Sequence, residues 1–387
     1  MNISNENKYS CKTTLIKMKY IFISFLCILL VVFSCSLKNF GNIPQGERLE
    51  RVQQSPNYLN GQFQNISSVT TTDNKDNDKK KKRSVLRLAY RWVFAKEGAG
   101  VRPDSPVPTV KTDLHNLNLH DDLVVWLGHS STFLQIDGKR ILIDPVFSKA
   151  ASPVFFANRA FKGTSIYTAA DMPNIDYLII SHDHWDHLDY PTVKKLKSKV
   201  SKIICPLGVG EHFERWGFDM MRVVEMDWND TAQLDSMVEI VCLPARHFSG
   251  RGLKNRNQSL WASFLLKMPD MKIYVGGDGG YDTHFAEIGT GFDGVDLALL
   301  ENGQYNESWK HNHMMPEQVV QTGEDLKAKV VLPVHNSKFA LAHHPWYEPL
   351  NRITAAHDST SFMLITPMIG EVVSLCDSTF SFEKWWK

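Results

Sequence analysis

The chain has 387 residues, of which 43% are apolar and 11% aromatic, an ordinary globular composition that can fill a sizeable core. Lys and Arg number 43 against 42 Asp and Glu, so the formal net charge of +1 argues against the broad basic surface of a dedicated nucleic-acid-binding protein. The 6 cysteines form no disulfide framework, since half of them lie in or beside an N-terminal apolar segment.

The first predicted element is an export leader. Lys17 and Lys19 precede an apolar run over residues 21–33, which gives the charged start and short apolar core of a secretory signal. The run is too short to span a bilayer comfortably. The residues ending at Cys35 resemble the lipobox of bacterial lipoproteins. We therefore predict a lipoprotein signal peptide over residues 1–35, with Cys35 anchoring an exported protein to a bacterial membrane, facing the periplasm. An uncleaved signal anchor is the alternative.

A polar tether is predicted next, over residues 36–84, because residues 39–78 are rich in Asn, Ser, Gln and Thr. It ends in the basic run Lys79–Arg83, which we interpret as a solvated linker or, alternatively, as a segment attracted to anionic lipid headgroups. Residues 85–120 are expected to form an extension that packs on the core. A single catalytic domain would then occupy residues 121–387.

Strands are predicted where short apolar runs alternate with turn residues and helix-like stretches, a pattern that indicates sheets covered by helices. Three strands come first, at residues 124–127, 133–136 and 140–144, with a hairpin turn at Asp137 and Gly138 between the last two. Four later strands each end in a candidate metal ligand. These are residues 175–180 before His182, residues 239–243 before His247, residues 272–275 before Asp278, and residues 329–334 before His335.

The most specific pattern is His182-x-His184-x-Asp186-His187, placed directly after a buried strand. In an extended segment the first two histidines point to one side and can share an ion, and the following turn can carry Asp186 and His187 toward a second ion. Imidazole and carboxylate ligands without thiolate suit zinc, with iron or manganese as alternatives. For a lone histidine a structural role would be the usual interpretation, but four such ligands within six residues favour a metal site.

Three further residues complete the predicted site. His247 falls where the first ion lacks a ligand, and His335 would complete the second site. Asp278 lies among glycines over residues 276–280, which let the backbone approach closely, and its carboxylate can bridge two cations. Taken singly, each of the three could have a structural role instead, as a histidine at the end of a strand or as part of a glycine-rich turn. Together they predict a centre for two metal ions.

Several segments resemble one branch of a known family. The order of the ligands over residues 123–349 is similar to that of the metallo-β-lactamase superfamily, and residues 126–130, 142–148, 181–190 and 277–281 resemble its N-acyl-phosphatidylethanolamine phospholipase D branch. The resemblance implies an α/β fold, an αββα sandwich with a dinuclear metal site at the sheet edge.

By position, the resemblance assigns roles to individual residues. His182, His184 and His247 would bind one zinc ion, Asp186, His187 and His335 the other, and Asp278 would bridge them. Trp185 and His313 would contact the phospholipid headgroup, while Asp144 and His129 would orient ligands or simply form a structural turn.

The predicted function is a zinc-dependent hydrolase of phospholipase D type, in which a metal-bridging hydroxide, held by a centre that needs Asp186 and Asp278, cleaves N-acyl-phosphatidylethanolamine to N-acylethanolamine and phosphatidic acid. The expected partners are the phospholipid substrate and a membrane surface; a homodimer is compatible with this function and nucleic acid is not expected. The alternatives are a lactonase or another phosphodiesterase on the same site, and a catalytically silent metal-binding lipoprotein.

Overall fold

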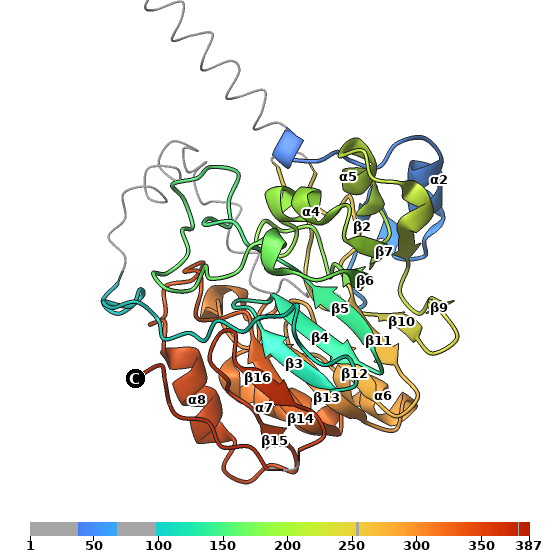
Figure 1. Ribbon diagram of the computed structural model, residues 1–387. Helices are drawn as coiled ribbons and strands as arrows, with labels where there is room; N and C mark the ends of the chain where they lie inside the picture. The colour runs from blue at the N-terminus through green and yellow to red at the C-terminus, as the bar shows by residue number, and fades with distance from the viewer. Residues whose placement is uncertain (1–37, 68–97, 253–254, 378) are drawn as a thin grey trace, which may run out of the picture.

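Two seven-stranded mixed sheets face one another at the centre of the molecule, which the computed structural model describes over residues 38–67, 98–252, 255–377 and 379–387 (Figure 1). The first sheet has the order β16-β3-β4-β5-β6-β7-β8. Its strands are β3 Leu123–Trp126, β4 Thr132–Ile136, β5 Lys139–Ile143, β6 Ile175–Ile179, β7 Val200–Pro206, β8 Val223–Met226 and β16 Val372–Ser374.

The second sheet has the order β15-β14-β13-β12-β11-β10-β9, and it is parallel from β12 to β15. Its strands are β9 Thr231–Gln233, β10 Glu239–Leu243, β11 Ser263–Lys267, β12 Lys272–Val275, β13 Val295–Glu301, β14 Ala328–Val334 and β15 Met363–Leu364. The seven strands expected from the sequence are all present in these two sheets, and none of their ends is displaced by more than one residue.

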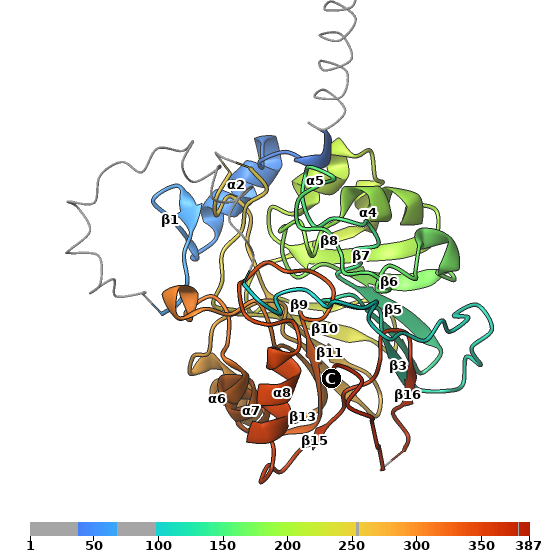
Figure 2. The same cartoon turned by 90° about the vertical axis from the view of Figure 1, so that its left-hand side faces the viewer.

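Helices cover the outer faces of both sheets. In both views α4 and α5 lie on the first sheet, and α6, α7 and α8 lie on the second (Figures 1 and 2). Their bounds are α4 Tyr190–Leu196, α5 Gly210–Arg215, α6 His284–Gly291, α7 Pro316–Asp325 and α8 Glu348–Ala356, with short 3₁₀ helices η2 Ala169–Asp171, η3 Met220–Arg222 and η4 Glu307–Trp309. This arrangement confirms the expected αββα sandwich.

Strand periodicity explains why the sheets pack on both sides. In β3, Val124 and Trp126 point into the core between the sheets, whereas Val125 points to the helical face of the first sheet. Since all four residues of β3 are buried, the strand is apolar throughout rather than alternating with polar residues. Both faces of the central strands are therefore occupied by packing, which favours the strand ends as the place for the polar side chains of a site.

The N-terminal residues 38–67 differ from the expected tether. They form α2 Gly46–Gln54, which lies beside α5, and a small hairpin of β1 Tyr58–Leu59 and β2 Gln62–Phe63 (Figure 1). Val52 and Phe63 are fully buried in the core between the sheets. The prediction of little structure was wrong for this part because a few apolar and basic anchors suffice to fix a segment that is polar on average. We refer to residues 38–67 as the N-terminal strap.

The remaining termini also pack on the sandwich. Val107 and Leu114, within residues 98–120, are buried, and so is Trp386, whose Nε1 donates to Asn351 Oδ1 at 2.9 Å. Within the described ranges, no helix combines the length and apolarity needed to cross a membrane. The predicted signal peptide, the lipidated Cys35 and the basic run Lys79–Arg83 lie outside the described residues.

We expect Arg48→Ala to destabilise the protein. The Arg48 guanidinium lies 2.7 Å from Glu225 and 2.8 Å from Glu211, and the side chains of these acids are only 4% and 9% exposed. Removing the cation leaves two buried carboxylates without their partner, which typically costs about 3 kcal/mol. The free energy of unfolding in urea measures the effect.

Arg51→Ala serves as the control, because Arg51 is 54% exposed and its nearest carboxylate oxygen lies 3.8 Å away. An exposed pair of this kind contributes less than about 1 kcal/mol. Equal losses in the two variants would contradict the importance of the buried cluster.

Candidate metal centre

The polar side chains of the centre extend from the carboxyl ends of strands in both sheets. The loop after β6 carries His182 to His187, and the loops after β10, β12 and β14 carry His247, Asp278 and His335. Because the two sheets face one another, these strand ends meet at one edge of the sandwich. All seven residues that the sequence predicted as ligands are brought together there.

The first cluster consists of His182, His184, His247 and Asp278. His184 Nδ1 lies 2.9 Å from His182 Nε2 and 3.2 Å from His247 Nε2. Three imidazole nitrogens thus converge on one small volume. Such an arrangement is typical of nitrogen lone pairs that share a cation.

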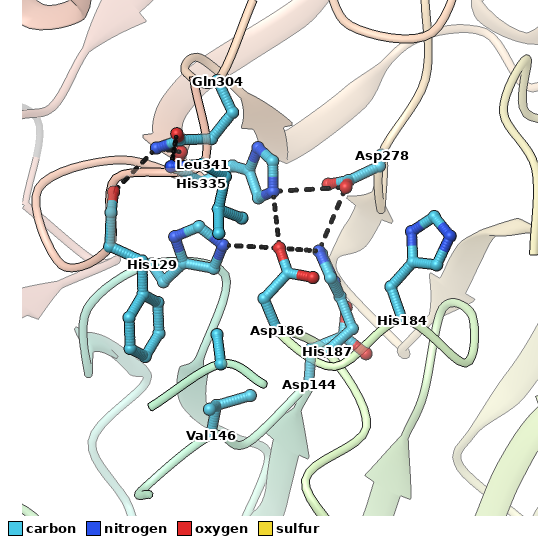
Figure 3. A network of polar contacts seen from close by, with 12 residues as sticks. His129, Asp144, Val146, His184, Asp186, His187, Asp278, Gln304, His335 and Leu341 are labelled. Atoms are coloured by element: carbon cyan, nitrogen blue, oxygen red, sulfur yellow. Dashed lines mark hydrogen bonds and ion pairs between the residues drawn. The ribbon is translucent and has the colours of Figure 1, made fainter. Parts of the chain in front are cut away.

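The second cluster consists of Asp186, His187, His335 and His129 (Figure 3). Asp186 Oδ2 lies 2.8 Å from His129 Nε2, 3.1 Å from His335 Nε2 and 3.5 Å from His187 Nε2. His129 follows β3 and is completely buried. We interpret it as the supporting residue anticipated from the sequence, because its short contact is with a carboxylate of the cluster.

Asp278 joins the two clusters. Its Oδ2 lies 3.1 Å from His187 Nε2 and 3.2 Å from His335 Nε2 on one side, and 3.8 Å from His182 Nε2 and 3.7 Å from His247 Nε2 on the other. The contacts to His187 and His335 are drawn in Figure 3. One carboxylate between two groups of imidazoles is the arrangement expected for a residue that bridges two cations.

Asp144 orients histidines of both clusters. Its Oδ2 accepts from His187 Nδ1 at 2.8 Å and from Ser181 Oγ at 2.6 Å. Because the Ser181 hydroxyl donates to Asp144, it accepts from His182 Nδ1 at 3.0 Å. Both imidazoles therefore carry their proton on Nδ1 and turn the Nε2 lone pair toward the centre.

His247 is oriented in the same way by a backbone carbonyl. Its Nδ1 lies 3.0 Å from Asn312 O, which can only accept, so Nε2 presents its lone pair to the first cluster. Partners of this kind behind metal-ligating histidines fix both the tautomer and the direction of the ring.

The electrostatics of the buried residues also suit a cation. Burial would raise the pKa of Asp278, but the charges of His187 and His335 hold it well below its ordinary value. Burial and the neighbouring imidazoles hold the pKa of His182 well below its ordinary value, and burial does the same for His247. Neutral imidazoles and ionised carboxylates are the protonation states that metal binding requires.

His187 is the exception. Burial opposes its charged form, but the charges of Asp278, Asp186 and Asp144 raise its pKa well above the ordinary value. Three buried carboxylates around one imidazole leave an excess of negative charge. His187 Nε2 and Asp278 Oδ1 are buried without a hydrogen-bond partner, as expected of atoms that would face metal ions, so the residues fit such ions.

The backbone around the second cluster has left-handed conformations at three non-glycine residues. His129, Asp144 and His335 have φ of +55°, +41° and +64°, a region that such residues adopt rarely. A backbone hydrogen bond joins two of these residues, since His129 O accepts from His335 N at 2.9 Å. The same oxygen also accepts from Trp126 Nε1 at 2.7 Å. Backbone strain of this kind concentrates at functional sites.

The two residues predicted to contact substrate have different surroundings. His313 lies beside the clusters, with its ring 5.3 Å from that of His335 and 5.1 Å from that of His247. The ring of Trp185 instead lies 5.0 Å from Phe40 of the strap and 4.0 Å below the Arg251 guanidinium. Substrate contact remains a prediction for both residues.

Glu301, at the end of β13, is a residue of the centre that sequence reasoning missed. It is 1% exposed, and its carboxylate accepts from His313 Nδ1 and from Met314 N, each at 2.7 Å. Burial lowers the pKa of His313, but the charge of Glu301 and the hydrogen bond to it outweigh burial and raise the pKa to about 9. The available signal was an acidic residue directly after the apolar run 297–300, in the same position as the candidate ligands that follow other strands.

Arg251 lies in the basic loop that follows His247, yet it is 1% exposed. Its Nη1 donates to the carbonyl oxygens of Asp183 at 2.8 Å and Leu188 at 2.6 Å. The side chain therefore stabilises the histidine-rich loop through its backbone carbonyl groups. Because it is buried, it is not available in this conformation to bind a ligand from solution.

Comparison with known proteins identifies the fold and the family. A family model described as a β-lactamase superfamily domain matches residues 139–336. An uncharacterized protein of Mycobacterium tuberculosis is 38% identical over 343 residues, covering 87% of this chain and 88% of that protein.

One relative has an activity in its name. The N-acyl-phosphatidylethanolamine-hydrolyzing phospholipase D 1 of Caenorhabditis elegans is 28% identical over 298 residues, covering 71% of this chain and 82% of that protein. Among solved structures, a metallo hydrolase of the archaeon Ignicoccus hospitalis, Igni18, has a TM-score of 0.51 and 20% identity, covering 68% of this chain and all of that one. This structural likeness supports the fold.

We expect Asp144→Asn to weaken metal binding in both clusters, because Asp144 orients His187 directly and His182 through Ser181. Loss of such a supporting partner typically lowers metal affinity by about 10- to 100-fold. Competition with a chelator, followed by metal analysis of the protein, measures the change.

Asp176→Asn is a matched control at the opposite end of β6, where Asp176 Oδ2 accepts from Arg140 N at 2.9 Å. It should leave metal affinity unchanged. Unaltered binding in Asp144→Asn would mean that the hydrogen bonds of Asp144 do not orient the ligands.

Proposed function

Because the chain belongs to the β-lactamase superfamily and is a metal-dependent hydrolase, we propose that it is a zinc-dependent phospholipase D-type phosphodiesterase that cleaves N-acyl-phosphatidylethanolamine. The observation that carries the reaction class is Asp278 Oδ2, which lies within 4 Å of imidazole nitrogens in both clusters. A pair of metal sites sharing one carboxylate suits displacement at phosphorus, where attacking and leaving oxygens both need stabilisation.

The substrate class is supported by similarity. The Caenorhabditis elegans relative named for N-acyl-phosphatidylethanolamine hydrolysis is 28% identical over 298 residues, which cover 71% of this chain. Fold and metal ligands alone leave the substrate open, because one superfamily hosts many hydrolytic reactions. Lactones and other phosphodiesters are therefore the competing substrates.

In the proposed reaction, water adds its oxygen to phosphorus, the bond from phosphorus to the ethanolamine oxygen breaks, and a proton ends on that oxygen. The products are N-acylethanolamine and phosphatidic acid. When bound, the metal ions would lower the pKa of water and act as Lewis acids toward phosphoryl oxygens. His182, His184, His247, Asp186, His187, His335 and Asp278 would hold them.

The protein's own contribution is to fix these ligands before substrate arrives. Asp144 and Asn312 set the direction of ligand imidazoles, and Glu301 holds the ring of His313 beside His247 and His335. We propose that His313, held in this position, contacts the phosphate or the ethanolamine oxygen of a bound lipid. Rigid positioning of this kind lowers the cost of bringing reacting groups together.

Zinc is the metal that we favour. The described clusters consist of imidazole nitrogens and carboxylate oxygens, with no cysteine among them. Zinc accepts this donor set, and iron or manganese are the alternatives that share it. Metal analysis of the purified protein distinguishes the three.

A surface loop supports a lipid substrate. Phe155 and Phe156 are 82% and 58% exposed at the tip of a loop that backbone hydrogen bonds order, among them Ala151 N to Asn158 O at 3.0 Å. Paired aromatic rings held out in water are costly unless they enter an apolar phase. We propose that this tip enters the bilayer surface, which would present the substrate to the centre, and that the predicted lipid anchor at Cys35 would keep the enzyme there.

We expect the full-length protein, loaded with zinc, to release N-acylethanolamine and phosphatidic acid from N-acyl-phosphatidylethanolamine in mixed micelles, as followed by mass spectrometry. Asp278→Ala should lower kcat/KM by at least about 10³-fold, because it removes the group shared by both metal sites. Asp358→Ala changes an exposed residue that belongs to neither cluster, so this variant should retain activity.

The outcomes separate the alternatives. A protein with two bound zinc ions that does not turn over this lipid would contradict the substrate assignment and direct attention to lactones and other phosphodiesters. Turnover by Asp278→Ala at the parent rate would contradict the catalytic centre itself.

We expect the double change Phe155→Ala and Phe156→Ala to weaken binding to vesicles of phosphatidylglycerol and phosphatidylethanolamine. Burial of one Phe side chain contributes about 1.5–3 kcal/mol, so partial insertion of two should give about a tenfold loss or more. Co-sedimentation with vesicles measures the effect. Met221→Ala, which changes a side chain 93% exposed on η3, is the control, and equal binding by all three proteins would count against the tip.

A further inference from the structure

The N-terminal strap, residues 38–67, reaches the metal centre although it lies outside the segment that matches the family model. Near its end, Asn65 contacts the loop that carries His247 directly. Near its start, Asn42 contacts His212 on α5, which in turn contacts Asp183 of the histidine-rich loop.

Asn65 pairs with both backbone groups of the ligand His247. Its Nδ2 donates to His247 O at 3.0 Å, and its Oδ1 accepts from His247 N at 3.1 Å. The same Oδ1 accepts from Trp261 Nε1 at 3.2 Å, and Trp261 is 1% exposed. One amide therefore fixes the backbone of a ligand residue against a rigid part of the core.

Such pairing matters because His247 lies in a loop without regular secondary structure, four residues after β10 ends. The backbone of a loop has few other constraints on its direction, and an error of a fraction of an ångström at a ligand weakens coordination. Asn65 supplies two hydrogen bonds that a strand ladder would otherwise provide. Asn312 O, which lies beside the ring of His247, then has only to fix the rotation of that imidazole.

Asn42 acts on the histidine-rich loop through His212. Asn42 N donates to His212 Nδ1 at 3.1 Å, so His212 carries its proton on Nε2 and donates it to Asp183 Oδ2 at 3.1 Å. Asp183 lies between the ligands His182 and His184 and is 2% exposed. Its other oxygen accepts from Gly250 N at 2.7 Å, which ties this loop to the one that carries His247.

Both contacts lead to the same half of the centre. His182, His184 and His247 form the first cluster with Asp278, whereas His129 contacts Asp186 and His335 of the second cluster. Asp144 serves both clusters, through His187 and through Ser181 and His182. The hydrogen bonds from the strap therefore distinguish the two metal sites. We propose that Asn65 is a positioning residue for His247 and that the strap selectively sets the metal affinity of the first cluster.

This inference rests on the proposed metal centre and is independent of the substrate. The experiment compares full-length parent, Asn65→Ala and Asn57→Ala. Asn57 belongs to the same strap and its Nδ2 donates to Asp227 Oδ1 at 3.0 Å, away from the ligands, so it is a matched control. Zinc is removed stepwise with a chelator, and cobalt(II) loaded in its place gives absorption bands that report ligand geometry.

We expect Asn65→Ala to lower the affinity of one of two metal equivalents by about 10- to 100-fold, with the other equivalent unchanged and the cobalt spectrum of the weakened site altered. Asn57→Ala should match the parent in both respects. Asn65→Asp keeps the acceptor for His247 N and Trp261 Nε1 but loses the donor to His247 O, and it should have intermediate affinity.

Three results would overturn the proposal: parent affinity at both sites in Asn65→Ala, equal weakening of both sites together with unfolding, or a parent that binds no metal. A parent that binds two metals without hydrolysing lipid would contradict the proposed substrate alone. Since binding and spectra are measured without substrate, the two failures are distinguishable.

Discussion

Buried negative charge at the meeting point of the strand ends governs this structure. Asp144, Asp186 and Asp278 are all nearly inaccessible, and three carboxylates so close together are stable only beside positive charge or as metal ligands. The sandwich makes such a place available because both faces of each sheet are consumed by packing, which leaves polar chemistry to the loops at one edge. The rigid strands behind those loops then limit how far the carboxylates can move apart.

The two clusters are supported by different means. Asp144 supports both clusters, because it contacts His187 directly and His182 through Ser181. A single aspartate therefore sets the orientation of ligands in both. Left-handed backbone at His129 and His335 supports the second cluster, whereas side chains from the distant strap support the first. The two halves of the centre therefore differ in how their ligands are held in position.

Much of the site could be predicted from sequence because its information is local. His182 to His187 lie within six residues, and each remaining ligand follows an apolar run whose end marks the same sheet edge. The strap could not be predicted, since its average composition is polar and its anchors, such as Phe63 and Arg48, have partners more than 160 residues away. Glu301 was missed for a related reason: a single acid after a strand has no spacing pattern, and only the fold places it beside His313.

The separation in sequence between Asn65 and His247 has a consequence for the order in which the protein folds. Their hydrogen bonds join residues 182 positions apart, and closing so long a loop requires most of both sheets to be in place first. The strap is made early in synthesis, but its partner loop emerges only after more than half of the chain. Assembly of the first cluster is therefore expected to be a late event, and a polypeptide truncated before residue 247 would carry the histidine-rich motif without the means to complete it.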